Sequence, residues 1–269
     1  MILNVEESKS KKGVSIIAKW GLIAKGSVYV LSGVLAFMAA FHMGGKQNED
    51  VDKNGALNFL SDSFGGKWLL PILAVGLLCY SIWRFIEAAK IANSGDKKWK
   101  KLFRYILSGI VYLSIALSAF KIVLSRSQKN EDSQQQFASE LLSKPFGQWL
   151  LGIAALIIAG IGIYQIYYAV SEKYKTHVQK MNLHTKASSL MLTAGKTGYL
   201  ARGAVWLIIS YLMLQAAFAA SSARAGGTGK AFNAIEDSPI GPYLPAALGV
   251  GLVAYGFFNF VRARYERFE

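Results

Sequence analysis

The chain has 269 residues, 53% of them hydrophobic, with 26 glycines, 5 prolines and a single cysteine, Cys79. Several apolar runs of about twenty residues carry almost no charge, and this is the length that a helix needs to cross a hydrocarbon layer of about 30 Å. These runs exclude a soluble protein built around one large core. The lone cysteine excludes internal disulfides and multi-cysteine metal sites, and the net charge of +14 lies between the apolar runs without a nucleic-acid motif, which argues against a nucleic-acid partner.

The first apolar run extends from about residue 16 to 43 and follows several lysines, as the apolar region of a signal peptide would. It is longer than such a region, and a matching helix recurs later in the chain, so we expect a retained transmembrane helix. Five further spans are expected at about 68–91, 102–125, 147–171, 198–220 and 243–264.

Short amphipathic pieces stand in the polar connections that follow the first, third and fifth spans. They occupy residues 56–60, 137–142 and 231–235. Each is too short to cross a bilayer, so we expect them to lie in the headgroup region and to lead into the next span.

A longer connection, residues 173–197, separates the fourth and fifth spans and contains His177 and His184. No carboxylate pair stands beside these histidines, and two histidines alone rarely complete a metal site. A solvated linker with an interfacial apolar stretch at 190–192 is therefore favoured over a metal centre.

A glycine followed three residues later by an aromatic residue marks the first helix of three tandem repeats. The glycines are Gly26, Gly109 and Gly203. The repeats occupy residues 1–97, 98–177 and 178–269, each with two spans, so all three enter the membrane in the same direction and allow a pseudo-threefold axis along the membrane normal. We predict an all-α polytopic membrane protein in which these glycines pack helices closely, with a homo-oligomer contact or a pore lining as the alternative role.

The distribution of basic residues predicts the orientation. With both termini placed in the cytoplasm, 21 of the 30 lysines and arginines fall on the cytoplasmic side. Trp68, Trp149 and Tyr243 begin the second helix of each repeat at the outer side, where we expect them to anchor the helices at the headgroup level.

Polar residues recur sixteen positions after each of these aromatic residues, about 24 Å further along the helix, and also directly before each repeat glycine. They are Arg84, Gln165 and Asn259, and Lys25, Ser108 and Arg202. One interpretation is a polar ring that gates or selects an anion. The other is that Lys25, Arg84 and Arg202 extend to the lipid headgroups as depth anchors, with Glu87 spaced to pair with Arg84.

Enzyme chemistry has no sequence signature in this chain. There is no glycine-rich phosphate loop, no nucleophile elbow and no pair of intramembrane carboxylates. We therefore expect a non-enzymatic protein with no cofactor and no metal.

Three motifs carry a resemblance to a known family. They are residues 198–203 (GYLARG) with Trp206, residues 145–151 (PFGQWLL) and residues 249–256 (GVGLVAYG). The chain resembles, over nearly its whole length, bacterial membrane proteins of unknown function built from tandem two-helix repeats. The resemblance implies this fold and topology, and it implies no activity and no catalytic residue.

Two functions from different classes remain open. The favoured one is a scaffold or accessory subunit in the bacterial inner membrane, with basic cytoplasmic loops facing anionic lipid, another membrane protein or a second copy of the chain. The alternative is a channel or transporter for a small solute or anion along the pseudo-threefold axis. An amphipathic ligand bound between repeats is a third possibility.

Overall fold

The computed structural model describes residues 2–41, 43, 53–62, 66–93, 99–125, 133–181, 183–226, 230 and 243–266. Six long helices dominate it: α1 (Ile2–Ala40), α3 (Gly66–Asn93), α4 (Trp99–Ser125), α6 (Gly147–Val170), α8 (Thr185–Phe218) and α10 (Tyr243–Tyr265). All six are long and apolar enough to cross a bilayer. The prediction of a six-span, all-helical membrane protein is therefore confirmed.

Two of the long helices begin earlier than the sequence suggests. Helix α1 begins at Ile2 and α8 begins at Thr185, well before residues 16 and 198. For α8 the cause is visible in the stretch at 190–192, which continues the helix. Met191 is 3% exposed and packs in one cluster with Tyr174 and Phe258, so this stretch contributes to the core.

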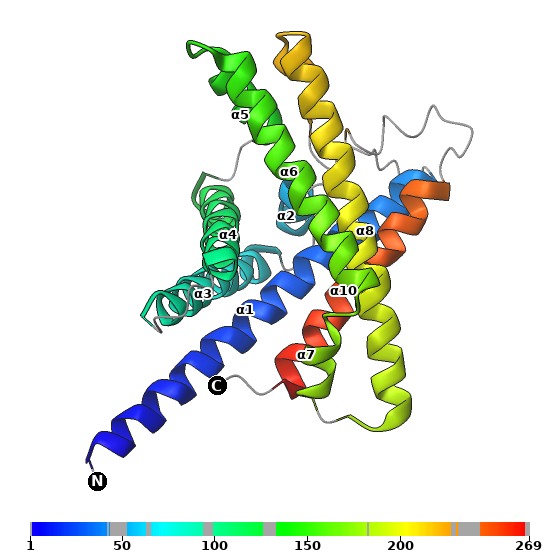
Figure 1. Cartoon of the computed structure of the whole chain (residues 1–269). Coiled ribbons are helices and arrows are strands. Elements are labelled where there is room, and N and C mark those ends of the chain that lie inside the picture. The colour runs from blue at the N-terminus through cyan, green and yellow to red at the C-terminus, as the bar shows by residue number, and fades with distance from the viewer. Residues whose placement is uncertain are drawn as a thin grey trace.

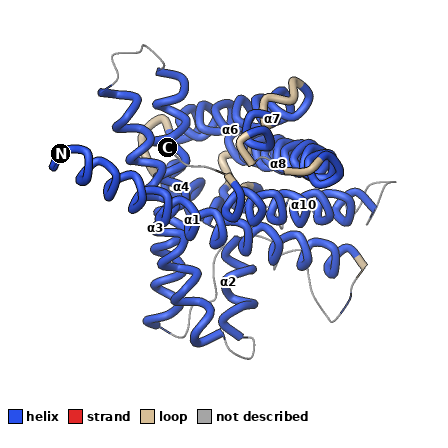
Figure 2. Tube along the Cα trace, turned by 90° about the horizontal axis from the view of Figure 1, so that it is seen from below, coloured by secondary structure: helices blue, strands red, loops and turns tan. Residues whose placement is uncertain are grey.

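The helices pack as three pairs, and each pair joins the second helix of one repeat to the first helix of the next. The pairs are α3 with α4, α6 with α8, and α10 with α1. Figures 1 and 2 show α1 and α10 lying side by side although they come from opposite ends of the chain. This third contact joins repeat three to repeat one, as a pseudo-threefold arrangement of the repeats requires.

Small residues set the closest approach within two of these pairs. A Cβ added at Gly26 would lie 2.9 Å from the carbonyl oxygen of Gly256, and one added at Gly203 would lie 3.0 Å from that of Gly162. Backbone cannot give way to a side chain at such distances. Two repeat glycines therefore lie where helix backbones nearly touch, a usual way of packing helices in lipid.

The remaining pair, α3 with α4, uses a serine at the equivalent position. Ser81 stands where the other repeats have Gly162 and Gly256, and its Oγ donates a 2.7 Å hydrogen bond to the carbonyl oxygen of Gly109. A Cβ at Gly109 would also lie 2.9 Å from the ring of Phe85. The third repeat glycine thus lies at the same kind of contact.

Contacts between the two helices of one repeat differ between repeats. A Cβ at Gly21 would lie 2.5 Å from the Cα of Tyr80, where α1 meets α3, and one at Gly198 would lie 2.7 Å from the Cα of Tyr255, where α8 meets α10. Repeat two has Arg104 at the position of these glycines. Over their described lengths, α4 and α6 make hardly any backbone contact, so the ring of helices opens between them.

Two short helices pack against the long helices of the bundle. Helix α2 (Lys53–Asp62) packs against α1, α3 and α4, and α5 (Ser133–Leu142) packs against α6, α8 and the 3₁₀ turn η3 (Ser222–Arg224). Ala56, Leu57 and Ala138 are fully buried. These two amphipathic pieces therefore pack against the long helices and lead into α3 and α6. The expected third piece, 231–235, lies outside the described residues.

Candidate functional site

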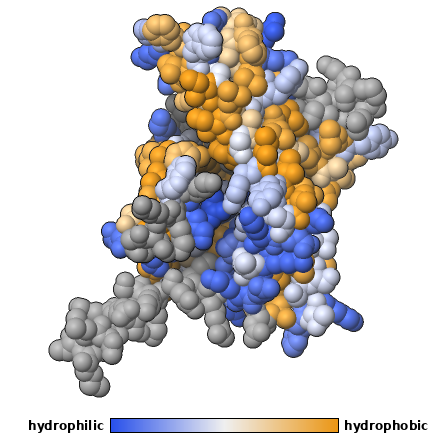
Figure 3. Space-filling view, in the orientation of Figure 1, coloured by the Kyte–Doolittle hydropathy of each residue, from blue (hydrophilic) through white to orange (hydrophobic). Residues whose placement is uncertain are grey.

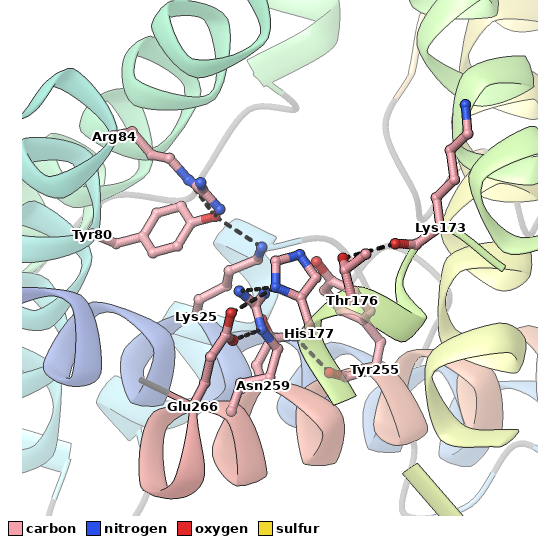
Figure 4. Close-up of polar contacts among 10 residues, drawn as sticks. Lys25, Tyr80, Arg84, Lys173, Thr176, His177, Tyr255, Asn259 and Glu266 are labelled. Atoms are coloured by element: carbon pink, nitrogen blue, oxygen red, sulfur yellow. Dashed lines mark hydrogen bonds and ion pairs between the residues drawn. The ribbon is translucent and has the colours of Figure 1, made fainter. Parts of the chain in front are cut away.

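Lys25 and Arg84 share one tyrosine hydroxyl at the centre of the bundle. The ammonium of Lys25 donates a 3.0 Å hydrogen bond to the Oη of Tyr80, and Nε and Nη2 of Arg84 donate to the same oxygen at 2.9 and 2.6 Å. Figure 4 shows both cations pointing toward this hydroxyl from α1 and α3. Lys25 is only 4% exposed, so its side chain turns into the protein and does not extend to the headgroups.

Arg202 approaches the same centre from α8. Its guanidinium lies over the rings of Tyr29 and Tyr255, with its Cζ 4.9 and 4.3 Å from their centroids. The Nε is buried and has no hydrogen-bond partner among the described residues. A buried, unsatisfied donor on a cation is costly, so this atom is suited to an acceptor supplied from outside the chain.

Tyrosine rings pack between these cations. Tyr255 contacts Tyr29 and Tyr199 with centroids 4.8 and 5.2 Å apart, and Tyr80 contacts Tyr112 at 4.5 Å. The ammonium of Lys25 also lies 4.8 to 5.5 Å from three of these ring centroids. The negative face of an aromatic ring offsets part of the cost of burying a cation. We call this set the cation–tyrosine cluster: Lys25, Arg84, Arg202, Tyr29, Tyr80, Tyr112, Tyr199 and Tyr255.

A triad of His177, Arg262 and Glu266 adjoins this cluster. Nε of Arg262 donates to Oε2 of Glu266 at 2.5 Å, and Nδ1 of His177 lies 2.6 Å from Oε1 of the same carboxylate. His177 belongs to the short helix α7 (Lys175–Gln179), so the triad fastens α7 to the end of α10. The linker around His177 is thus less solvated than expected, because its imidazole meets a carboxylate 89 residues away. His184 is exposed at the start of α8.

The triad changes the ionisation of two groups that lie outside the membrane-spanning helices. Burial, and then the neighbouring Arg262, lower the pKa of His177 to about 4. Burial favours the neutral form of Glu266, but Arg262 and His177 outweigh it and hold the pKa of this carboxyl at about 2. His177 is then neutral at pH 7 and donates its Nδ1 hydrogen to the ionised carboxylate.

The other polar positions expected from the sequence are placed unevenly. Asn259 is fully buried beside the cluster, where Nδ2 donates to the carbonyl oxygen of Tyr255 and Oδ1 has no partner in the described part of the chain. Gln165 is 7% exposed with an unpaired Oε1, and no contact joins it to the cluster within the described residues. Ser108 is half-buried on α4. Glu87 pairs with Lys90 at 3.4 Å and not with Arg84.

The three aromatic residues expected at the outer interface lie in the first turns of α3, α6 and α10. Trp68, Trp149 and Tyr243 are 79%, 75% and 71% exposed. Their rings face outward from the bundle, the geometry that an interfacial anchor requires.

Positive charge exceeds negative charge at this centre. Four cations lie here, namely Lys25, Arg84, Arg202 and Arg262. Among the described residues bonded to them there is one carboxylate, Glu266, and it pairs with Arg262. Figure 3 shows hydrophilic surface in a recess between the α3–α4 part and the α6–α8 part, below a mostly apolar surface. Buried cations without matching acids attract an anion. No three histidine, cysteine or acidic side chains in the described part of the chain lie close enough together to hold a metal ion.

The sequence did not reveal the tyrosines or the triad. Tyr80 and Tyr255 stand four residues before Arg84 and Asn259, and repeat two has Ile161 at that position. Aligning the repeats at this position would have distinguished the two tyrosine-bearing repeats from repeat two. No local signal joins His177 to Glu266, because their contact depends on tertiary structure.

A family model described as Domain of Unknown Function (DUF1206) matches the chain three times in tandem, over residues 20–90, 103–172 and 197–266. The chain belongs to this family. The uncharacterized protein YxxB of Bacillus subtilis (strain 168) is 27% identical over 263 residues, which cover 97% of this chain and 94% of that protein. No solved structure matches the chain. The resemblance expected from the sequence is thereby confirmed.

Proposed function

We propose that this family member is a non-enzymatic scaffold or accessory subunit of the bacterial inner membrane, with both termini in the cytoplasm, that holds an anionic group at the cation–tyrosine cluster. The proposal rests on the surplus of positive charge at this cluster. Lys25 and Arg84 have the Tyr80 Oη as their common acceptor, and the Nε of Arg202 has none among the described residues. An anion from a lipid or an acidic partner would supply the missing acceptors.

Purification in mild detergent, followed by mass spectrometry of bound lipids and proteins, tests this function. We expect the wild-type protein to retain an anionic lipid or an acidic membrane protein, and the double variant Arg84→Gln, Arg202→Gln to lose it. Arg264→Gln is the control, because it removes an exposed positive charge from α10 outside the cluster. Equal retention by wild type and double variant, or no retained species at all, would contradict the proposal.

The second candidate is an anion channel along the pseudo-threefold axis. It is favoured by the convergence of cations from repeats one and three at one level. Against it, tyrosine rings pack against one another between these cations, with centroids 4.5 to 5.2 Å apart. Liposomes that carry an anion-sensitive dye separate the two functions: an anion flux that Arg84→Ala and Arg202→Ala change supports the channel, and the absence of flux removes it.

A further inference from the structure

The opening between α4 and α6 follows from large side chains in repeat two. Where repeats one and three have Gly21 and Gly198, repeat two has Arg104. One helical turn away, the close contacts of Ala24 with Gly76 and of Ala201 with Gly251 are replaced by Leu107 and Ile157. The two helices of repeat two therefore cannot approach as their counterparts do, and the bundle is open to the surrounding lipid on this side.

One hydrogen bond spans this opening near the level of the cluster. Nη1 of Arg104 on α4 donates to the Oη of Tyr164 on α6 at 2.9 Å. Tyr164 is 41% exposed, so the contact lies at the rim of the opening. Such a bond, made by a long, partly exposed side chain, can be exchanged for one to a ligand with little change in the fold.

Polar and aromatic side chains continue from the rim to the cluster along both walls. On the α4 side, the guanidinium of Arg84 lies 5.2 Å from the ring centroid of Tyr105. On the α6 side, Tyr168 contacts Tyr164 and Tyr199, with centroids 6.1 and 4.9 Å apart, and Tyr199 belongs to the cluster. The opening therefore leads from Arg104 at the rim to the cations of the cluster.

Apolar side chains surround this polar path. Large exposed residues of α4 and α6 face the lipid on either side, among them Ile106, Ile110, Ile153 and Ile157. Contact with such a surface does not stabilise a bound soluble anion. A lipid, in contrast, would place its acyl chains there and its phosphate among the cations. Charge complementarity and the apolar flanks together identify the occupant.

We propose that the α4–α6 opening admits the headgroup of an anionic phospholipid to the cation–tyrosine cluster, while its acyl chains stay against α4 and α6. The phosphate accepts hydrogen bonds from Arg84 and from the Nε of Arg202, and Arg104 contacts it at the rim in place of Tyr164. Asn259 Oδ1 accepts from a headgroup hydroxyl. The proposal rests on the function proposed above and specifies the ligand and its route.

Binding of phosphatidylglycerol to the full-length protein in neutral detergent, followed by native mass spectrometry, tests the site. We expect phosphatidylglycerol to bind more tightly than phosphatidylcholine, and Arg84→Gln with Arg202→Gln to weaken it by about tenfold or more, since charge-assisted hydrogen bonds are lost. An equal effect of Arg264→Gln would show general attraction to positive charge and overturn the site. Complete competition by millimolar inorganic phosphate would identify a free anion and overturn the lipid.

The route has its own test. The triple variant Arg104→Gly, Leu107→Ala, Ile157→Gly gives repeat two the small residues of the other repeats. It should bind less phosphatidylglycerol than the single variant Arg104→Gln, which removes the contact at the rim and keeps the opening. Phosphatidylglycerol with a photoreactive acyl chain, applied to the wild-type protein, should label peptides of α4 and α6. Labelling confined to α1 and α10 would overturn the route even if the triple variant misfolds. A retained anion or partner that depends on the cluster, without phosphatidylglycerol binding, would refute this inference and leave the proposed function standing.

Discussion

Repeats one and three are closed between their two helices, and repeat two is open. In the closed repeats, Gly21 and Gly198 let a helix backbone lie directly on the backbone of Tyr80 or Tyr255. In repeat two, Arg104 occupies that position, and α4 and α6 hardly touch over their described lengths. Larger residues at a few repeat positions thus open the bundle, and one of them, Arg104, adds a cation at the opening.

The same comparison explains where the cluster lies. The tyrosines around Arg202, and two of the three around Lys25, come from repeats one and three. Repeat two contributes Tyr112 and the walls of the opening. Identical repeats would give three equal interfaces around a symmetric axis. Divergence of one repeat turns that symmetric bundle into an asymmetric one with a site reached from the side.

Cysteine cross-linking tests most directly whether the two helices of repeat two lie further apart than those of repeat three. In a Cys79→Ser background, we expect Ala201→Cys with Gly251→Cys to form a disulfide after mild oxidation, because a Cβ at Gly251 would lie 2.4 Å from that of Ala201 and a small displacement reaches disulfide geometry. The equivalent pair in repeat two, Leu107→Cys with Ile157→Cys, should remain reduced. Mobility on non-reducing gels measures both, and an efficient disulfide in repeat two would show that α4 and α6 are not apart.

Leucine at one repeat position should change the free energy of unfolding differently in the closed and the open repeat. Gly198→Leu should lower the free energy of unfolding by about 1–3 kcal/mol or more, because its side chain would meet the backbone of Tyr255. Arg104→Leu should cost less than about 1 kcal/mol, since it removes one partly exposed hydrogen bond. Gly160→Leu is the control for added bulk, as nothing lies within 4 Å of its Cβ position. Thermal unfolding in detergent measures all three, and equal losses for Gly198 and Arg104 would contradict the difference between the repeats.

The sequence predicted the spans and the threefold repeat, because apolar length and repeated glycines are local signals. It did not predict which helices pair most closely, since each sequence repeat spans two helices whereas the tightest pairs cross repeat boundaries. That pairing depends on position 81, 162 or 256 of the second helix facing a repeat glycine. Lys25, Arg84 and Arg202 were identified from their repeat positions, but their tyrosine partners look like ordinary core aromatics in the sequence.

Acid should weaken the attachment of α7 to the end of α10 in repeat three. The pKa of His177 is about 4 in the folded protein against an ordinary value of 6.5, so the unfolded chain takes up a proton first as the pH falls. Stability should therefore decrease from about pH 6.5 to pH 4 and continue to fall below pH 4.5 as the unfolded chain protonates Glu266, whose folded pKa is about 2. Thermal midpoints measured across this range test it, with His177→Gln as the variant that should show a flatter profile above pH 4.5. Parallel profiles for the two proteins would remove His177 as the cause.

The smallest effect is expected outside both regions, at Glu87. Its carboxylate pairs with Lys90 on the same helix, and the two side chains are 24% and 47% exposed, so Glu87→Gln should change the free energy of unfolding by less than about 0.5 kcal/mol. Phosphatidylglycerol binding should also stay unchanged, because Arg84 directs its guanidinium to Tyr80 and leaves its charge available to an anion. Lys90→Gln is the matched control, and it should have an equally small effect. If Glu87→Gln instead strengthened lipid binding several-fold while Lys90→Gln did not, Glu87 would be neutralising Arg84, and the surplus of positive charge at the opening would be one cation smaller than the structure indicates.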